Sequence, residues 1–459
     1  MTSLWTGHAI ADATGGALSA PFAVSGVAFD SREVQPGDLF VAMRGETADG
    51  HDFVERAQTS GAAGMLVERP VAGPHVLVGD SFEALVALGA AARERTSAKI
   101  IGITGSAGKT GTKEALFHAL DRMSFGAAHR SLKSYNNHVG VPLSLARMPA
   151  DTRYGIFEMG MNHEGELRAL TALVRPHVAI VTTIAPAHIE YFGTEAKIAE
   201  AKAEIFEGLE PGGTAIIPFD SPHCALLTEA AAAHAGRIVT FGFGEGADVR
   251  ALEAVPAEHG GTQVNARLHG ASLSFTLSMP GRHWVANALA VLAGVQAVEG
   301  DIAVAGLALA RLPGMPGRGE RRRIRTADGG EALLIDEAYN ANPASMAATL
   351  AQLGEEAGGR HIAVLGAMKE LGEQSASLHA GLAGAVRQGR VDHAVLVGQE
   401  MAPLAEALSG DMKLDLVTDA HEAIAQVGAM LKDGDVVLVK GSNSVGLSRL
   451  VTALSVETV

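Results

Sequence analysis

The sequence predicts an α/β protein of three domains: a small N-terminal α/β domain, a central domain on a parallel sheet, and a C-terminal domain with an open sheet. The chain has 459 residues, more than one hydrophobic core normally serves. Apolar runs that end in glycine or a polar residue alternate with stretches of helical composition, first from KIIGITG and again from LLIDEAYN. This alternation is typical of parallel sheets covered by helices. We therefore place the domains at 1–97, 98–314 and 315–459.

The composition argues against several classes of protein. Acidic residues outnumber basic ones by 51 to 36, and the net charge of −15 argues against a surface for nucleic acid or acidic membranes. Cys224 is the only cysteine, so no intramolecular disulfide can form and we expect a reducing compartment. No apolar run reaches about 18 residues, and MTSLWTGHAI does not have the form of a secretion signal. We expect a cytoplasmic protein that does not insert into membranes.

The first domain begins with short apolar runs separated by turns. Their pattern predicts three strands, at 24–29, 38–43 and 64–67, and a helix at 52–60. Asp30, Ser31 and Arg32 directly follow the first of these strands. Such side chains either cap the turn or face a ligand, and the residues alone favour neither explanation.

The central domain carries apolar runs of the parallel-sheet type, namely KIIGITG, YGIFEMG, VAIVTTI, GTAIIPF and RIVTFGF. Ligands are expected at the carboxyl ends of such strands. Period-two alternation at 247–280 predicts an antiparallel extension, and a helix follows at 285–298. The glycines and prolines of LPGMPGRG, at 312–319, are typical of a linker between domains.

The third domain repeats the alternation with LLIDEAYN, HIAVLG, HAVLVG and VVLVKG, each followed by helical composition. An open, Rossmann-like sheet is the architecture expected for this order. The run GRGERRRIR lies at the start of this domain. It predicts either a solvated charged strand, which is the commoner case, or a patch that faces phosphate.

A phosphate-binding loop is predicted at the start of the central domain. A buried strand with isoleucines at 100, 101 and 103 leads into the turn and helix of GSAGKTGTKE. The glycines of this stretch are expected to give the backbone conformations closed to residues with a Cβ: Gly102, Gly105, Gly108 and Gly111. Lys109 is placed to reach phosphate oxygens beside a helix N-terminus, and Thr110 to offer its hydroxyl to Mg²⁺. The strict G-x-x-x-x-G-K-[ST] pattern is not met, because Ile103 stands where its first glycine belongs.

Several polar side chains follow the strands of the central sheet. Glu158 ends the strand YGIFEMG and either binds Mg²⁺ or simply ends a strand. His188 follows the next strand, where a histidine can ligate a metal, take a proton or be a satisfied buried residue. Lys202 lies on a helix, and a solvated lysine is the general expectation there. Asn136 and Asn137 can be turn residues.

Further candidates lie near the predicted linker. A single arginine directed into the crevice, Arg318, would stabilise phosphoryl charge during transfer. Asp336, Tyr339 and Asn340 end the strand in IDEAYNANP, where they can face nucleotide and metal from the other side. Tyr339 either stacks on a base or packs.

The combination of these strings resembles the Mur ligase family of ATP-dependent, amide-forming enzymes. The motifs occur in the family's order over essentially the whole chain: TGSAGKT, SYNNHVGVP, FEMG, IAPAHIEYFG, AKAEIF, GRHWVANALAV, GRGER, DEAYNANP, LGAMKELG and VKGSNS. Within the family, FEMGMNHEGEL, DEAYNANPASM and LGAMKELGEQSASLH are similar to the members that add D-alanyl-D-alanine to UDP-N-acetylmuramoyl-tripeptide in peptidoglycan precursor synthesis.

The resemblance implies a three-domain enzyme, with UDP in the first domain, ATP in a P-loop ATPase domain in the centre, and the incoming dipeptide in the third domain. We also expect a monomer. ATP would phosphorylate the terminal carboxylate of the tripeptide. The amine of D-alanyl-D-alanine would then attack the acyl phosphate to give the amide and phosphate. Two Mg²⁺ ions would offset the charge of the anions brought together.

The resemblance also implies roles for single residues. The ATP-binding set would be Gly105, Ser106, Gly108, Lys109, Thr110, Gly111, Asn287, Arg318, Asp336, Tyr339 and Asn340. The metal set would be Thr110, Glu158, His188 and Lys202, with Lys202 as a carbamylated lysine. Lys109, His188, Lys202 and Arg318 would act in catalysis. The substrate-binding set would be Asp30, Ser31, Arg32, Asn136, Asn137, His379 and Lys440.

Four positions depart from the pattern of the family. Trp284 stands where an asparagine is expected, which would leave adenine recognition to Asn287, and Gly111 where threonine or serine is usual. Ala367 stands where aspartate is common, and Asn443 where arginine is frequent.

Competing hypotheses for the function are another Mur-type ligase that adds diaminopimelate, a folylpolyglutamate synthase, and a nucleotide-dependent switch without ligase chemistry.

Overall fold

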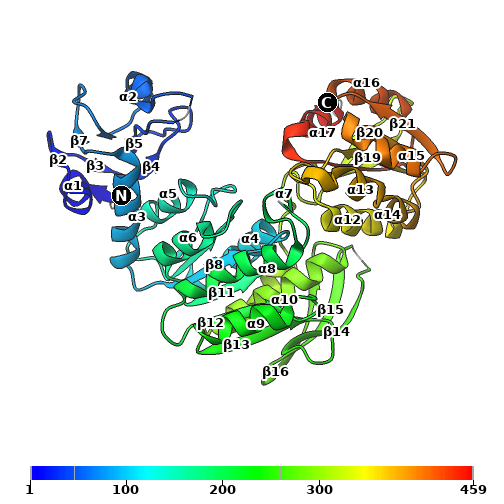
Figure 1. Ribbon diagram of the computed structural model, residues 1–459, viewed down its shortest axis with the longest axis horizontal. Helices are drawn as coiled ribbons and strands as arrows, with labels where there is room; N and C mark the ends of the chain where they lie inside the picture. The colour runs from blue at the N-terminus through cyan, green and yellow to red at the C-terminus, as the bar shows by residue number, and fades with distance from the viewer. Residues whose placement is uncertain (1–2, 46, 188, 259, 457–459) are drawn as a thin grey trace.

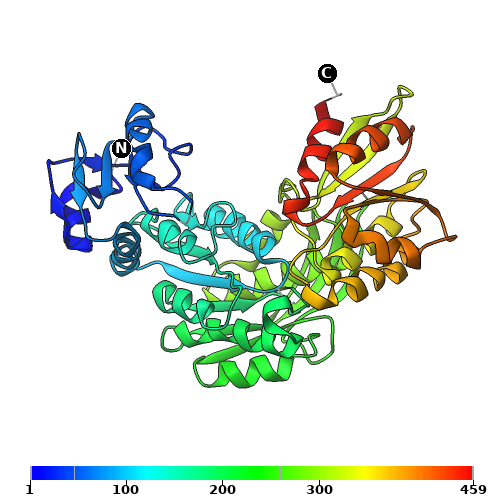
Figure 2. The ribbon, with the colours of Figure 1, turned by 45° about the horizontal axis from the view of Figure 1, so that its top comes forward.

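The computed structural model describes residues 3–45, 47–187, 189–258 and 260–456. The chain forms three lobes, each with its own large sheet, and the central lobe lies between the other two (Figure 1). A second view keeps the N-terminal and C-terminal lobes on opposite sides of the central one (Figure 2). The predicted three-domain α/β organisation is confirmed, whereas the bounds 1–97, 98–314 and 315–459 stay a prediction. Among the described residues, no helix is both long and apolar enough to cross a membrane.

The N-terminal lobe contains a five-stranded sheet in the order β2-β7-β6-β5-β4. Its strands are β2 (Ala17–Leu18), β4 (Gly26–Ala28), β5 (Asp38–Val41), β6 (Gly64–Val67) and β7 (His75–Leu77). All three predicted strands are present, the first broken into β3 (Ala23–Val24) and β4. The predicted helix is a 3-10 turn, η1 (Gly50–Phe53), that runs into α2 (Val54–Thr59). The remaining helices are α1 (Gly7–Thr14) and α3 (Ser81–Glu94).

The central lobe is built on a nine-stranded sheet in the order β16-β15-β14-β13-β12-β11-β8-β10-β9. The parallel strands are β8 (Lys99–Thr104), β9 (Ala128–Arg130), β10 (Tyr154–Glu158), β11 (Val178–Val181), β12 (Thr214–Pro218) and β13 (Arg237–Gly242). The strands β14 (Val249–Pro256), β15 (Thr262–Leu268) and β16 (Ala271–Leu277) continue the sheet, with antiparallel pairing from β14 to β16. The predicted antiparallel extension is therefore confirmed.

Helices cover both faces of this sheet. Because side chains alternate along a strand, Ile101 and Ile103 pack on one face and Ile100 on the other. The first face carries α4 (Lys109–Ser124), α10 (Arg282–Ala297) and α11 (Ile302–Leu309). The second face carries α5 (Gly140–Ala146), α6 (Glu166–Val174), α8 (Glu195–Ala203) and α9 (Cys224–Ala232). A short helix, α7 (Ile189–Phe192), precedes α8.

The C-terminal lobe has a six-stranded sheet in the order β17-β18-β22-β19-β20-β21. Its strands are β17 (Glu320–Arg325), β18 (Glu331–Glu337), β19 (His361–Gly366), β20 (His393–Val397), β21 (Lys413–Val417) and β22 (Val436–Lys440). The helices are α12 (Pro343–Glu355), α13 (Ser375–Ala380), α14 (Ala383–Gln388), α15 (Ala402–Ala407), α16 (Ala420–Met430) and α17 (Ser448–Val456). β17 is an antiparallel edge strand, and its arginines at 321, 322 and 323 form ion pairs with nearby glutamates. The arginine-rich run is thus mostly a charged edge strand.

Candidate active site

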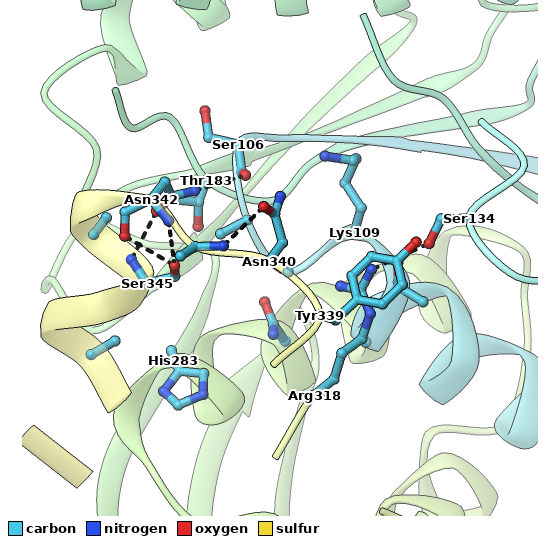
Figure 3. Close-up of a pocket in the computed structure, with 18 of the residues that line it drawn as sticks. Ser106, Lys109, Ser134, Thr183, His283, Arg318, Tyr339, Asn340, Asn342 and Ser345 are labelled. Carbon is cyan, nitrogen blue, oxygen red and sulfur yellow. Dashed lines mark hydrogen bonds between the residues drawn. The ribbon is translucent and has the colours of Figure 1, made fainter. Parts of the chain in front are cut away.

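A cavity of about 490 Å³ lies where the central lobe meets the C-terminal lobe. Its wall is made by the glycine loop and first turn of α4, the end of β10, the start of α10, the linker, and the loop from β18 into α12. Figure 3 shows Lys109 of the central lobe near Arg318, Tyr339 and Asn340, which come from the linker and the C-terminal lobe. The cavity lies at the carboxyl ends of β8 and β10, where the sheet pattern predicts a ligand.

Two glycines of the loop have backbone conformations that favour glycine. Gly105 has φ 149°, and an ideal Cβ there would lie 1.9 Å from Oγ1 of Thr182. Gly108 has φ 83°, and its Cβ would lie 2.6 Å from Oδ1 of Asn287. These close approaches let the loop fold tightly, so that Lys109 Nζ donates a hydrogen bond of 2.6 Å to the Gly105 carbonyl.

We expected the other two glycines, Gly102 and Gly111, to have backbone conformations closed to other residues, and this is wrong. Gly102 lies in β8 and Gly111 in α4, and neither has a positive φ. A Cβ on Gly102 would lie 2.6 Å from Cε of Met159, and a Cβ on Gly111 would lie 2.8 Å from Cη2 of Trp284. These positions favour glycine because a side chain would collide with a neighbour, whereas the backbone itself is ordinary.

Ser106 anchors the loop through both its side chain and its main chain. Its hydroxyl donates to the Ala185 carbonyl at 2.9 Å and accepts from the Ala185 amide at 3.0 Å. Its amide donates to the Thr183 carbonyl, and its carbonyl accepts from Nδ2 of Asn342 in the C-terminal lobe at 3.2 Å. Ser106 therefore fixes the shape of the loop, and its own polar atoms are already bonded.

Glu158 is a buried carboxylate, 1% exposed, at the end of β10. Its Oε2 accepts from the Thr110 hydroxyl at 2.9 Å, and its Oε1 accepts from Nδ2 of Asn136 at 2.8 Å. All three residues line the cavity. A hydroxyl and a carboxylate oxygen are suitable ligands for Mg²⁺, so this group fits the expected metal. No cluster of three or more His, Cys, Asp or Glu side chains occurs in the described residues, so Thr110 and phosphate oxygens would have to complete the site.

Lys202 is buried in α8, 1% exposed, and lines the cavity, so the general expectation of a solvated lysine is wrong here. Burial and then the nearby Lys109 lower the pKa of the Lys202 ammonium well below its ordinary value. Among the described residues, the Lys202 ammonium forms no hydrogen bond or ion pair, whereas its backbone carbonyl accepts from the Glu204 amide. Burial also lowers the pKa of Lys109, and Glu158 opposes that shift. The other proposed metal ligand, His188, lies outside the described residues.

Arg318 reaches from the linker to the central lobe. Its Nη2 donates to the Ser134 hydroxyl at 3.2 Å, and its guanidinium lies 4.0 Å from the ring centre of Tyr339 (Figure 3). Tyr339 is 38% exposed and also lines the cavity. A fixed cation and a partly open aromatic face therefore lie side by side on the cavity wall.

The end of β18 shapes this wall from behind. The Asp336 carboxylate accepts from the amides of Gly317 at 2.8 Å and Ala338 at 3.1 Å, while burial raises its pKa. Lys440 is buried, and its Nζ donates to the Asn340 carbonyl at 3.0 Å and to Glu337 at 3.3 Å. Asn340 and Lys440 line the cavity, whereas Asp336 holds the turn that carries Arg318.

Comparison with known families shows which family the chain belongs to. The Mur ligase middle domain matches residues 103–295, the Mur ligase glutamate ligase domain matches 317–443, and the catalytic domain of the Mur ligase family matches 23–122. The chain belongs to the Mur ligase family.

Similar proteins cover this Mur ligase almost end to end. A Synechocystis protein named UDP-N-acetylmuramoyl-tripeptide--D-alanyl-D-alanine ligase is 35% identical over 451 residues, which is 96% of this chain and 94% of that protein. The Escherichia coli protein of the same name is 33% identical, covering 95% and 94%. Among solved structures, MurF from Acinetobacter baumannii has a TM-score of 0.84 at 32% identity, covering 98% of each chain. MurF from Thermotoga maritima in complex with ADP has a TM-score of 0.79 at 28% identity, covering 95% and 98%.

Some residues predicted for the site of this Mur ligase are not brought to the cavity. His379 is fully buried, its Nε2 accepts from the Met368 amide at 3.0 Å, and its Nδ1 bonds the Ser375 carbonyl at 2.8 Å. This arrangement gives His379 a structural role, and its role as a substrate contact stays a prediction. Asp30, Ser31 and Arg32 lie in the N-terminal lobe, where Asp30 and Arg32 pair locally at 2.6 Å. They stay candidates for the UDP pocket.

Asn136 and Asn137 have different roles although they are adjacent. Asn136 bonds Glu158 on the cavity wall, whereas Oδ1 of Asn137 accepts from the Gly140 amide at 2.9 Å and caps the start of α5. The turn explanation is thus correct for Asn137. Its role as a substrate contact stays a prediction.

Sequence reasoning missed several residues of the site. They are Lys113, Ser134, His283 and Asn342. Lys113 did leave a signal, because it occupies the same helical face as the buried Leu116 and Leu120, at spacing i, i+3, i+7. A lysine on a buried apolar face needs hydrogen-bond acceptors or a carboxylate in the interior. Ser134 and Asn342 left no comparable signal, since their partners are distant in the sequence.

Proposed function

We propose that this Mur ligase uses ATP to join D-alanyl-D-alanine to UDP-N-acetylmuramoyl-tripeptide through an acyl phosphate, in peptidoglycan precursor synthesis. The proposal follows the names of relatives that are 31–35% identical over at least 93% of this chain. One observation of the fold supports it above the others. The loop lysine Lys109, the buried carboxylate Glu158 and an arginine from the linker, Arg318, line the same cavity.

The proposed reaction has two steps. An oxygen of the tripeptide carboxylate attacks the γ-phosphorus of ATP, and ADP leaves. The amine nitrogen of the dipeptide then attacks the acyl carbon, phosphate leaves and the nitrogen loses a proton. Lys109 and Arg318 would hold the phosphoryl oxygens, whose charge must be stabilised during transfer. Asn287 and Tyr339 would contact the base. UDP would bind the N-terminal lobe near Ser31, and the dipeptide the C-terminal lobe near Lys440.

Magnesium is part of the proposal. Thr110 and Glu158, whose oxygens lie 2.9 Å apart, would hold one ion, and His188 and Lys202 would contribute to a second. When bound, the ions would neutralise charge on the phosphates. Lys109 would supply positive charge on the loop side of the cavity, while Glu158 accepts a hydrogen bond from Asn136.

Lys202 is proposed to carry a carbamate. Carbon dioxide reacts with a neutral amine, forming an N–C bond and releasing one proton. The lowered pKa favours that neutral amine, and the described surroundings offer Lys202 no counter-ion. The carbamate would replace the neutral amine by an anion beside Lys109, and that anion can hold a metal.

Phosphate release tests the proposed function. It should require ATP, Mg²⁺, UDP-N-acetylmuramoyl-tripeptide and D-alanyl-D-alanine together. Turnover with diaminopimelate or an L-amino acid, but not with the dipeptide, would show another Mur-type ligase. Turnover of a folate with glutamate would show a folylpolyglutamate synthase, and nucleotide binding without turnover would show a switch. We also propose that the protein is cytoplasmic and monomeric. Light scattering should then give the mass of one chain.

A further inference from the structure

We propose that Lys113 is a positioning residue of the ATP site, which holds Glu158 and the segment 131–137 in a fixed relation to each other. Lys113 lies in α4, four residues after Lys109, and its side chain is fully buried. It lies behind the cavity wall, so it would act through Glu158 and not by touching nucleotide. The inference rests on the proposed use of Mg²⁺ and ATP, and it adds a residue to that site.

The surroundings of Lys113 match its chemistry. Its Nζ donates to the Lys133 carbonyl at 2.5 Å and lies 3.3 Å from Oε1 of Glu114 and 3.6 Å from Oε2 of Glu158. An ammonium has three N–H donors, and three acceptors surround this one. A buried ammonium without such partners would be costly in free energy. The interior at this point is therefore built around the charge of Lys113.

Glu158 is held by three groups, and only Lys113 is removed from the cavity. Thr110 and Asn136 bond the carboxylate but also line the cavity, where their polar atoms are available to a bound cation or nucleotide. Lys113 approaches Oε2 from the interior of the lobe. Lys113 can keep the Glu158 carboxylate oriented when the Thr110 hydroxyl binds a cation or nucleotide instead.

The segment 131–137 makes Lys113 relevant to all three lobes. Lys133 forms an ion pair with Glu33 of the N-terminal lobe, and the Tyr135 hydroxyl donates to Glu33 at 2.8 Å. Ser134 accepts from Arg318, and Asn136 donates to Glu158. Lys113 fixes this segment through the Lys133 main chain. Loss of Lys113 should therefore loosen the carboxylate and its amide partner together.

Four variants separate this role from other effects. Lys113→Met removes the charge at similar length, and Lys113→Gln keeps a donor for the Lys133 carbonyl but no charge for Glu158. Lys133→Met removes the ion pair with Glu33 but leaves the carbonyl that Lys113 uses. Arg122→Met removes an exposed cation from the same helix and is the matched control. Circular dichroism checks that each variant is folded.

The readout is the affinity for Mn²⁺, measured by electron paramagnetic resonance with a non-hydrolysable ATP analogue present. We expect Lys113→Met and Lys113→Gln to weaken Mn²⁺ binding about 10–100-fold, as does the loss of a group that orients a metal ligand. Lys133→Met and Arg122→Met should bind as the wild type does. Wild-type affinity in folded Lys113→Gln, or an equal loss in Lys133→Met, would overturn the proposal. No peptide substrate is present, so an error in the proposed acceptor leaves this result unaffected.

Discussion

The first turn of α4 passes so close to Trp284 that an ideal Cβ on Gly111 would lie 2.8 Å from Cη2 and 3.0 Å from Cζ3 of the indole. Trp284 is 6% exposed and packs in the core that joins α4 to α10. The family resemblance marks both positions as departures from the expected pattern, and the two residues meet in space. A large side chain on α10 thus occupies the volume that a larger residue at position 111 would need.

Because of this contact, we expect Gly111→Ala to change stability in the direction opposite to that of an ordinary helical Gly→Ala substitution. Gly→Ala in a helix normally stabilises by about 1 kcal/mol. Gly111→Ala should instead destabilise by about 1–3 kcal/mol, because overpacking forces a rigid ring to move. The expected measurement is a lower Tm and weaker binding of an ATP analogue.

A double-mutant cycle isolates the contact with Trp284. In the background of Trp284→Leu, which removes the ring atoms that Cβ would meet, Gly111→Ala should become neutral or stabilising. If the alanine lowers Tm equally in both backgrounds, the collision with Trp284 does not decide the choice of glycine.

The elements were predictable where the pattern is local. The run with isoleucines at 100, 101 and 103 is β8, because a strand buried on both faces reads as a continuous apolar run. The loop after β8 was also predictable, because its glycines and Lys109 are close together in the sequence. Asn136 and Asn137 show the limit of prediction from sequence. They are adjacent residues of the same type, and only the fold shows that one side chain bonds Glu158 and the other the start of α5.

Burial of charge was harder to predict than the elements. The sequence places Lys202 on a helix, but only the packing of α8 against the cavity shows that its ammonium is buried without a partner in the described residues. His379 shows the reverse case, because the family resemblance implies a substrate contact, whereas the fold uses both ring nitrogens in internal hydrogen bonds.

Lys202 should make activity depend on carbon dioxide. Lys202→Ala should lower kcat about 10²–10³-fold, since a charged group near the transferring phosphoryl is lost. Depletion of dissolved carbon dioxide should lower wild-type activity, and added bicarbonate should restore it. Because only the neutral amine reacts, activity at fixed carbon dioxide should fall when the pH drops through the lowered pKa of Lys202.

A direct signal distinguishes the carbamate from other roles of Lys202. Labelled ¹³C-bicarbonate should give a carbamate resonance in the wild type that is absent from Lys202→Arg, which keeps a cation at this position. Full activity without carbon dioxide, together with no such resonance, would show that Lys202 acts as an unmodified amine.

His129 should set part of the acid sensitivity of the fold. It lies in β9, its Nε2 is 2.8 Å from the Ser144 carbonyl, and burial lowers its pKa to about 4. The native ring stays neutral while the unfolded ring takes a proton below its ordinary pKa near 6.5, so stability falls as the pH falls from about 6.5 to 4. The shift corresponds to about 3 kcal/mol.

The variant His129→Gln keeps a donor for the Ser144 carbonyl but does not titrate in this range. Urea unfolding followed at pH 7, 6, 5 and 4 should show a smaller loss of stability for the variant than for the wild type. Parallel curves for the two proteins would mean that other groups control the acid response.

Asn342 should join the C-terminal lobe to the phosphate loop independently of its role as a helix cap. Its side chain accepts from the Ser345 amide at 2.9 Å at the start of α12, and its Nδ2 donates to the Ser106 carbonyl at 3.2 Å. Asp caps a helix as well as Asn does but has no donor for that carbonyl. Asn342→Asp should therefore keep the stability of α12, yet raise KM for ATP and lower kcat. Asn342→Ala should do both and also cost about 1 kcal/mol from the lost cap. Steady-state kinetics with thermal melts separate these effects, and an Asp variant with wild-type kinetics would remove the contact to Ser106 from the working site.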